Sequence, residues 1–129
     1  MGLTEQTAGE TLDALLIAPP SLYLSLHTAQ PVENQLTHSV VTHEMTAGGY
    51  TRVDVTGGFD RSGRLVTNPA DIEVAEIDAL QVATHWGVWS HPTSTSPIHF
   101  RFFTAFNIPR TIQPSTPVTI PAGALRVRA

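Results

Sequence analysis

The segment 98–106 reads Ile-His-Phe-Arg-Phe-Phe-Thr-Ala-Phe, and its bulky apolar side chains fall at even positions, with Thr104 between them and only Phe103 out of phase. These positions are Ile98, Phe100, Phe102 and Phe106. Because successive side chains of a strand point to opposite faces, a period of two is typical of a strand with one buried face. The segment therefore predicts a strand that directs these side chains into a core and leaves His99 and Arg101 outside.

The same alternation recurs elsewhere in the chain. It is present at Leu22, Leu24 and Leu26, at Ile72 and Val74, at Val118 and Ile120, and at Leu125 and Val127. We expect strands at 21–28, 50–55, 65–68, 72–76, 83–90, 98–106, 118–121 and 124–128. The pattern predicts an all-β chain, an antiparallel β-sandwich of immunoglobulin-like or jelly-roll-like type with two sheets packed face to face.

Residues 4–17 predict one α-helix at the amino end. Thr4 can cap it, Glu5 lies in the positively polarised first turn, and apolar residues follow at helical spacing. Pro19 and Pro20 end the helix. Gly9 weakens the prediction for its first half, because glycine costs roughly 1 kcal/mol against alanine in a helix interior.

The connections between these elements are rich in polar and turn residues. The stretch after Thr28 reaches to about residue 47, and His38, His43 and Glu44 favour a loop rather than a buried strand. Gly57 to Gly63 predicts a turn region around Phe59. Residues 91–97 predict the long tip of a hairpin between strands 83–90 and 98–106.

A chain of 129 residues with 41% apolar residues is the size and composition of one domain, 1–129. It has no cysteine, which excludes disulfides and thiolate chemistry. Its longest apolar run, at 15–18, is far shorter than the roughly 20 residues that span a bilayer. We expect neither membrane insertion nor export by an amino-terminal signal.

The charge balance argues against a nucleic-acid binder. The net charge is −4, and all seven cationic side chains are arginines, whereas nucleic-acid binding needs a basic face. Arginine presents a planar fork that suits bidentate contacts between proteins. Arg126 and Arg128, on the outward face of the last strand, are therefore candidate docking residues.

Four segments in order carry a resemblance to a known family. They are Ser-Leu-Tyr-Leu-Ser-Leu-His-Thr-Ala-Gln-Pro at 21–31, Gly-Gly-Tyr-Thr-Arg at 48–52, Thr-His-Trp-Gly-Val-Trp at 84–89 and Thr-Ile-Pro-Ala-Gly-Ala-Leu at 119–125. Together they resemble small phage virion structural proteins of the tail fibre or minor tail type, with the pattern LYLxLHTAxP, GGY, THxGxxD, IPAGALTxT. The resemblance runs from the amino-terminal helix to the last strand.

The resemblance implies a noncatalytic role in the virion, on the tail or on the capsid shell. Two segments depart from the family pattern: Ser90 to Ser96 replaces an Asp-Ala-Ala-Thr-Gly-Gly hairpin, and the polar loop at 32–47 is longer. Both lie at expected exposed tips, where the choice of partner is expected to vary.

The residues themselves do not predict an active site. Six histidines lack a metal-ligand spacing, although His38 with His43 and His85 with His99 are candidate neighbours. The acidic residues Asp71, Glu73, Glu76 and Asp78 alternate with apolar ones, which favours a solvated outer face over acid–base chemistry. We expect no enzyme, no metal and no cofactor.

Aromatic side chains leave a carbohydrate-binding alternative open. Trp86, Trp89, Tyr23, Tyr50 and Phe103 include rings that could stack on sugars, but most are expected in the core. Trp89 and Phe103 are out of phase with their apolar neighbours and are the best candidates for exposed protein contacts.

We therefore predict a structural protein of the phage particle, made in the host cytoplasm, in the tail or tail-fibre adsorption apparatus. A capsid decoration protein that stabilises the head is the first alternative and a carbohydrate-binding module the second. Expected partners are other virion proteins and further copies of the chain, as in a trimer, and neither nucleic acid nor membrane; a cell-surface glycan stays open. The candidate interface residues are Trp89, Phe103, Arg101, Arg126 and Arg128.

Overall fold

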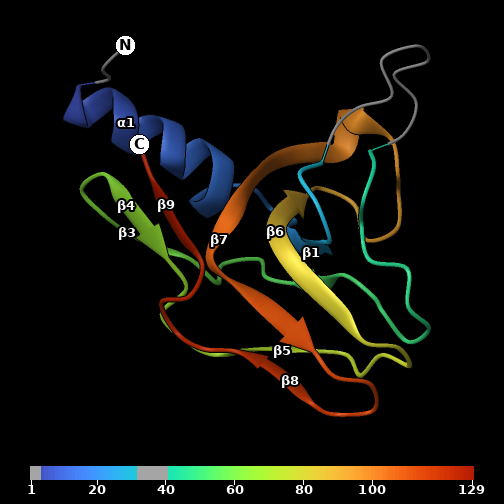
Figure 1. Cartoon of the computed structure of the whole chain (residues 1–129). Helices are drawn as coiled ribbons and strands as arrows, with labels where there is room; N and C mark the ends of the chain where they lie inside the picture. Colours follow the sequence, from blue (N-terminus) through green and yellow to red (C-terminus); the bar gives the residue numbers. More distant parts are fainter. Residues whose placement is uncertain (1–3, 32–40) are drawn as a thin grey trace.

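The computed structural model describes residues 4–31 and 41–129, and this part is built mainly from antiparallel strands with a short helix at the amino end (Figure 1). The elements are α1 (Glu5–Leu12), the π-helical turn η1 (Asp13–Ile17), β1 (Tyr23–His27), β2 (Val53–Asp54), β3 (Asp60–Ser62), β4 (Leu65–Thr67), β5 (Ile72–Val74), β6 (Gln81–Trp89), the 3₁₀ turn η2 (Pro97–His99), β7 (Phe100–Ile112), β8 (Val118–Ile120) and β9 (Arg126–Arg128). The predicted fold class, an all-β antiparallel sandwich with one amino-terminal helix, is confirmed.

The amino-terminal helix occupies the predicted residues and changes type along its length. The Thr4 hydroxyl accepts a hydrogen bond from the Thr7 N–H at 3.2 Å, which satisfies a free donor of the first turn. The guanidinium of Arg61 packs over Gly9, where a Cβ would lie 2.7 Å from Nη1. Arg61 in turn binds Asp13 through Nε at 2.7 Å and fastens the helix to β3.

The central layer is a four-stranded sheet in the order β2-β1-β6-β7. β1 and β6 are its inner strands, with Leu24 opposite Val88 and Leu26 opposite Trp86. β6 and β7 form the predicted hairpin. β7 runs past the predicted end at residue 106. It passes Pro109 because the ladder skips from Ala105 to Arg110, so the proline interrupts no paired position.

A bulge at Arg101 changes which face of the sheet the β7 side chains occupy. Phe102 lies opposite Val88 and Phe100 lies opposite Trp89, so Arg101 is an extra residue in the ladder. Phe102 therefore packs on the main core, whereas Phe100 lies on the other face against Trp89, with ring centroids 4.6 Å apart. The prediction of one shared core face for these residues is wrong for Phe100, and also for Ile98, which is 74% exposed in η2.

Gly87 makes room for the displaced Phe100 ring. A Cβ on Gly87 would lie 2.6 Å from Cε1 of Phe100 and 3.1 Å from the Phe102 carbonyl oxygen. Both distances are too short for a side chain at position 87. The Phe100 ring can therefore pack at this point of the sheet only over a glycine.

We expect Gly87→Ala to destabilise the fold by roughly 1–3 kcal/mol, because the new methyl group overpacks the site under Phe100. Urea unfolding followed by tryptophan fluorescence measures this. In the Phe100→Leu background the cost should fall, since the ring that clashes is gone. An equal cost in both backgrounds would show that Phe100 does not require the glycine.

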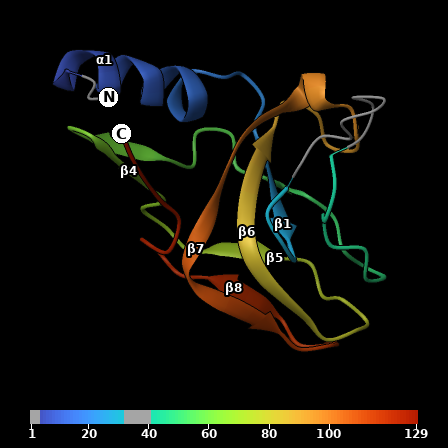
Figure 2. The same cartoon turned by 45° about the horizontal axis from the view of Figure 1, so that its top comes forward.

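The second layer is a bent two-stranded ribbon with one added strand. β4 pairs with β9, and β5 pairs with β8, while β3 is added beside β4. Since β4 leads to β5 and β8 leads to β9, the two pairs are successive halves of one ribbon, residues 65–74 with 118–128. β3 was not predicted, because its three residues are all exposed and polar. Figures 1 and 2 show α1 at the end where β9 finishes and β8 at the opposite end.

Asn68 holds the bend of this ribbon. Its side chain is fully buried, donates through Nδ2 to the carbonyls of Ala70 and Pro121, and accepts from the Leu125 N–H at 2.9 Å. Its backbone carbonyl accepts from the Gly123 N–H at 2.8 Å. Asn68 thus supplies partners for backbone groups of both halves at the corner, and the Asp71 carboxylate accepts from the Ala122 N–H there.

We expect Asn68→Ala to lower the free energy of unfolding by roughly 2–4 kcal/mol, because the Pro121 carbonyl and the Leu125 N–H lose the side-chain partner that Asn68 gives them. Asn107→Ala is the matched control, since Asn107 is exposed in the unpaired part of β7. Chemical denaturation of the two variants makes the comparison. Equal stabilities would contradict the role of Asn68.

The core lies between the two layers and is closed at one end by the helix. Trp86 is at its centre, with its ring stacked on Phe59 at 6.0 Å and edge-on to Phe102 at 5.9 Å. The predicted exposed loop before residue 47 is corrected for its last part, because Val41 and Met45 are buried. The rest of that prediction, at 32–40, lies outside the described residues.

Candidate interaction surface

Of the five predicted interface residues, four are exposed and one is buried. Arg101, Phe103, Arg126 and Arg128 are exposed, as expected. The prediction that Trp89 is exposed is wrong, because its side chain is fully buried. The reason is a layer of loop residues, 41–52, that covers the second face of the four-stranded sheet.

Arg52 is the side chain that covers Trp89. Its guanidinium carbon lies 3.6 Å from the ring centroid, and its Nε and Nη2 donate to both carboxylate oxygens of Glu44 at 2.9 and 2.7 Å. The Arg52 side chain is 4% exposed and that of Glu44 17%. A bidentate ion pair stacked on an aromatic face is strong only when it excludes water, as it does here.

Tyr50 extends this cluster to β1. Its hydroxyl donates to Glu44 at 2.7 Å and accepts from the Leu26 N–H at 3.1 Å. Burial, together with the Glu44 carboxylate, raises the pKa of the Tyr50 hydroxyl above its usual range, so the hydroxyl stays protonated. The alternation of Tyr50 and Arg52 about Thr51 is the sequence signal that places both side chains on one face.

Beneath this cluster, polar side chains of β1 form a buried hydrogen-bond chain. The Trp89 Nε1–H donates to Ser25 Oγ at 2.8 Å, and Ser25 Oγ lies 2.7 Å from His27 Nε2. His27 Nδ1 lies 3.4 Å from the Thr42 carbonyl, which can only accept. Nδ1 therefore carries the proton, and the Ser25 hydroxyl donates to Nε2 of a neutral His27.

His27 is held neutral by its surroundings. Burial lowers its pKa from 6.5 to about 4, and the Arg52 and His85 charges act in the same direction, while the Glu44 carboxylate and the Thr42 carbonyl oppose it. Protonation would also leave the Ser25 hydroxyl hydrogen without its acceptor. The cluster is satisfied internally, so it supports the fold rather than presenting a reactive group.

We expect the protein to lose stability as the pH falls from 6.5 to 4. The unfolded chain binds a proton at His27 in this window and the folded chain does not, so folding becomes less favourable by about 3 kcal/mol at pH 4. Urea unfolding at several pH values measures the slope. His27→Gln should flatten it, whereas the exposed His43→Gln should not; equal slopes in all three proteins would contradict the assignment.

Arg101 and Phe103 lie on the exposed side of β7. The bulge directs Arg101 to a cavity of about 490 Å³, whose other walls include Leu15, Pro19 and Pro20 from the end of the helical segment. Phe103 is 37% exposed and stacks on Phe100 at 6.0 Å. An apolar hollow beside an exposed cation is typical of protein contacts.

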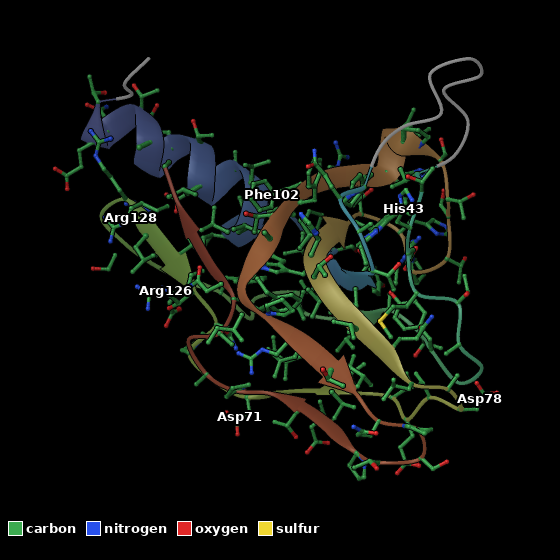
Figure 3. All side chains as sticks on the ribbon, in the orientation of Figure 1. His43, Asp71, Asp78, Phe102, Arg126 and Arg128 are labelled. Atoms are coloured by element: carbon green, nitrogen blue, oxygen red, sulfur yellow. The ribbon has the colours of Figure 1, made fainter. Side chains whose placement is uncertain are left out.

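Arg126 and Arg128 lie elsewhere, on the outer face of the ribbon (Figure 3). They flank the buried Val127 and lie opposite Thr67 and Leu65 of β4. Among the residues described, Arg101, Arg126 and Arg128 have no ion pair or hydrogen bond through their side chains, whereas Arg52 and Arg61 do. The predicted arginines therefore form two separate surfaces rather than one.

Four of the described histidines lie in two separate pairs. His85 pairs across strands with His27, and His99 lies against His91 at 5.3 Å, so the predicted neighbourhood of His85 and His99 is wrong. Within 4–31 and 41–129 no three His, Asp or Glu residues gather as metal ligands would. Asp71, Glu73, Glu76 and Asp78 are exposed, in agreement with a solvated outer face.

No helix among the described residues is long and apolar enough to cross a membrane. Comparison with known families places the chain in the class of bacteriophage fibre proteins. More closely, it belongs to the family described as Podophage GP4 fiber I protein gp80, whose model matches residues 3–128. No curated protein matches it. Membership implies a virion component that contacts other virion proteins, and it favours a structural over an enzymatic role.

Proposed function

We propose that the protein is a structural component of the tail-fibre adsorption apparatus of the phage particle. One observation carries the proposal: the fibre family model covers residues 3–128, and so the whole fold from the helix to β9 rather than one motif. We further propose that residues 1–129 act as one domain, which the shared core from Leu12 to Val127 supports.

The surface chemistry supports docking to proteins. Exposed arginines without partners among the described residues, and the hollow beside Arg101, are features that interfaces use. The aromatic side chains give less support to carbohydrate binding, because Trp86 and Trp89 are fully buried and Phe103 is only 37% exposed. Trp89 therefore cannot contact a partner directly. Its role at the proposed docking surface is to pack beneath Phe100 and Arg52.

Gold-labelled antibody against the protein on intact virions tests the location. We expect gold at the tail, and a low copy number per particle on a quantitative gel, because a tail holds far fewer subunits than a capsid shell. Label over the head with hundreds of copies would replace the proposal by a capsid decoration protein. Label on neither structure would overturn both assignments.

A further inference from the structure

The outer face of the ribbon carries opposite charges at its two ends. Arg126 and Arg128 project from β9, and Glu73 lies on the exposed side of β5 opposite Thr119. Asp71 precedes β5 and is exposed as well. Figure 3 shows Arg126 and Arg128 along the margin formed by β4 and β9, and Asp71 farther along the same margin.

Three of these four side chains have no direct partner within the described part of the chain, although exposed Asp60 of β3 lies in the same cross-strand row as Arg126. Arg126, Arg128 and Glu73 form no hydrogen bond or ion pair there through their side chains, and Asp71 uses one carboxylate oxygen to accept from the Ala122 N–H at 2.9 Å. Arg52 and Arg61, by contrast, each bind one carboxylate through Nε and Nη2 of the guanidinium.

The two charged residues at one end of the ribbon are spaced like the two at the other end. Residues two apart on an extended chain lie roughly 7 Å apart, so Arg126 with Arg128, and Glu73 with Asp71 just before β5, place two charges at a similar interval. Within each end the like charges repel, and a face of opposite charge relieves this repulsion. A surface with a positive and a negative end is complementary to itself when one copy is rotated by half a turn.

We propose that the outer face of the ribbon, residues 65–74 with 118–128, binds a second copy of this chain, with Arg126 and Arg128 of one copy against Asp71 and Glu73 of the other. The contact goes beyond the proposed function, because it concerns the isolated protein wherever that protein sits in the virion. Exposed ion pairs contribute only about 0.2–1 kcal/mol each, so the charges set the register and the salt dependence. Burial of the half-exposed Leu65 between the copies adds apolar contact.

Sedimentation velocity of the full chain over a concentration series, at low and high salt, tests the proposal. We expect association at low salt that weakens at high salt. Glu73→Arg should weaken association at least about tenfold, because it replaces attraction by repulsion at each contact. Glu10→Arg is the matched control, with the same charge change on an exposed residue of α1, and should associate as the wild type does.

Charge exchange gives the sharper result. A half-turn places Arg128 against Glu73 and Arg126 against Asp71. Arg128→Glu alone should also weaken association, and an equimolar mixture with Glu73→Arg should restore it, because every contact in the mixed pair joins opposite charges. Urea midpoints equal to that of the wild type exclude unfolding as the cause. A monomeric wild type, equal losses in Glu73→Arg and Glu10→Arg, or a mixture that fails to associate would each overturn the contact. The gold-label experiment is independent of all these outcomes.

Discussion

The bulge at Arg101 is the feature on which the arrangement of the four-stranded sheet depends. By inserting one residue opposite the step from Val88 to Trp89, it allows a single strand to supply Phe102 to the main core and Phe100 to the opposite face. Without it, that second face would lack the ring that shields Trp89 and His27. The same insertion turns Arg101 toward the hollow at the end of the helix, so packing and surface chemistry arise from one backbone irregularity.

The two faces of that sheet are covered by different means. On the main face, apolar side chains from the ribbon and the helix form a core around Trp86. On the other, the cover is polar and comes from residues 41–52, where Arg52 and Glu44 neutralise each other above Trp89. A buried ion pair contributes little net stability against apolar residues of the same size, but it selects one arrangement, since each polar group has only one set of partners.

Local patterns in the sequence were sufficient for the fold class and for most elements. The helix was predictable from Thr4 and the Pro19-Pro20 stop, and the β6–β7 hairpin from alternation, because these signals act between neighbours in the chain. The errors arose where distant residues decide: Phe100 follows a bulge permitted by Gly87, and Trp89 is covered by a loop nearly forty residues earlier. The exposed arginines of β9 were predictable because alternation about Val127 fixes their side, whereas no local signal reveals the chain from Trp89 to His27.

The unpaired stretch of β7 has a practical consequence. Between Ala105 and Arg110 the strand leaves its partner and rejoins it, and residues 107–109 are exposed and absent from the ladder. Extra residues placed between Asn107 and Ile108 would lengthen an existing detour, because the paired segments on either side keep their register. This position is therefore suited to carry a foreign epitope or an affinity tag, presented at the rim of the sheet without a new loop having to be created.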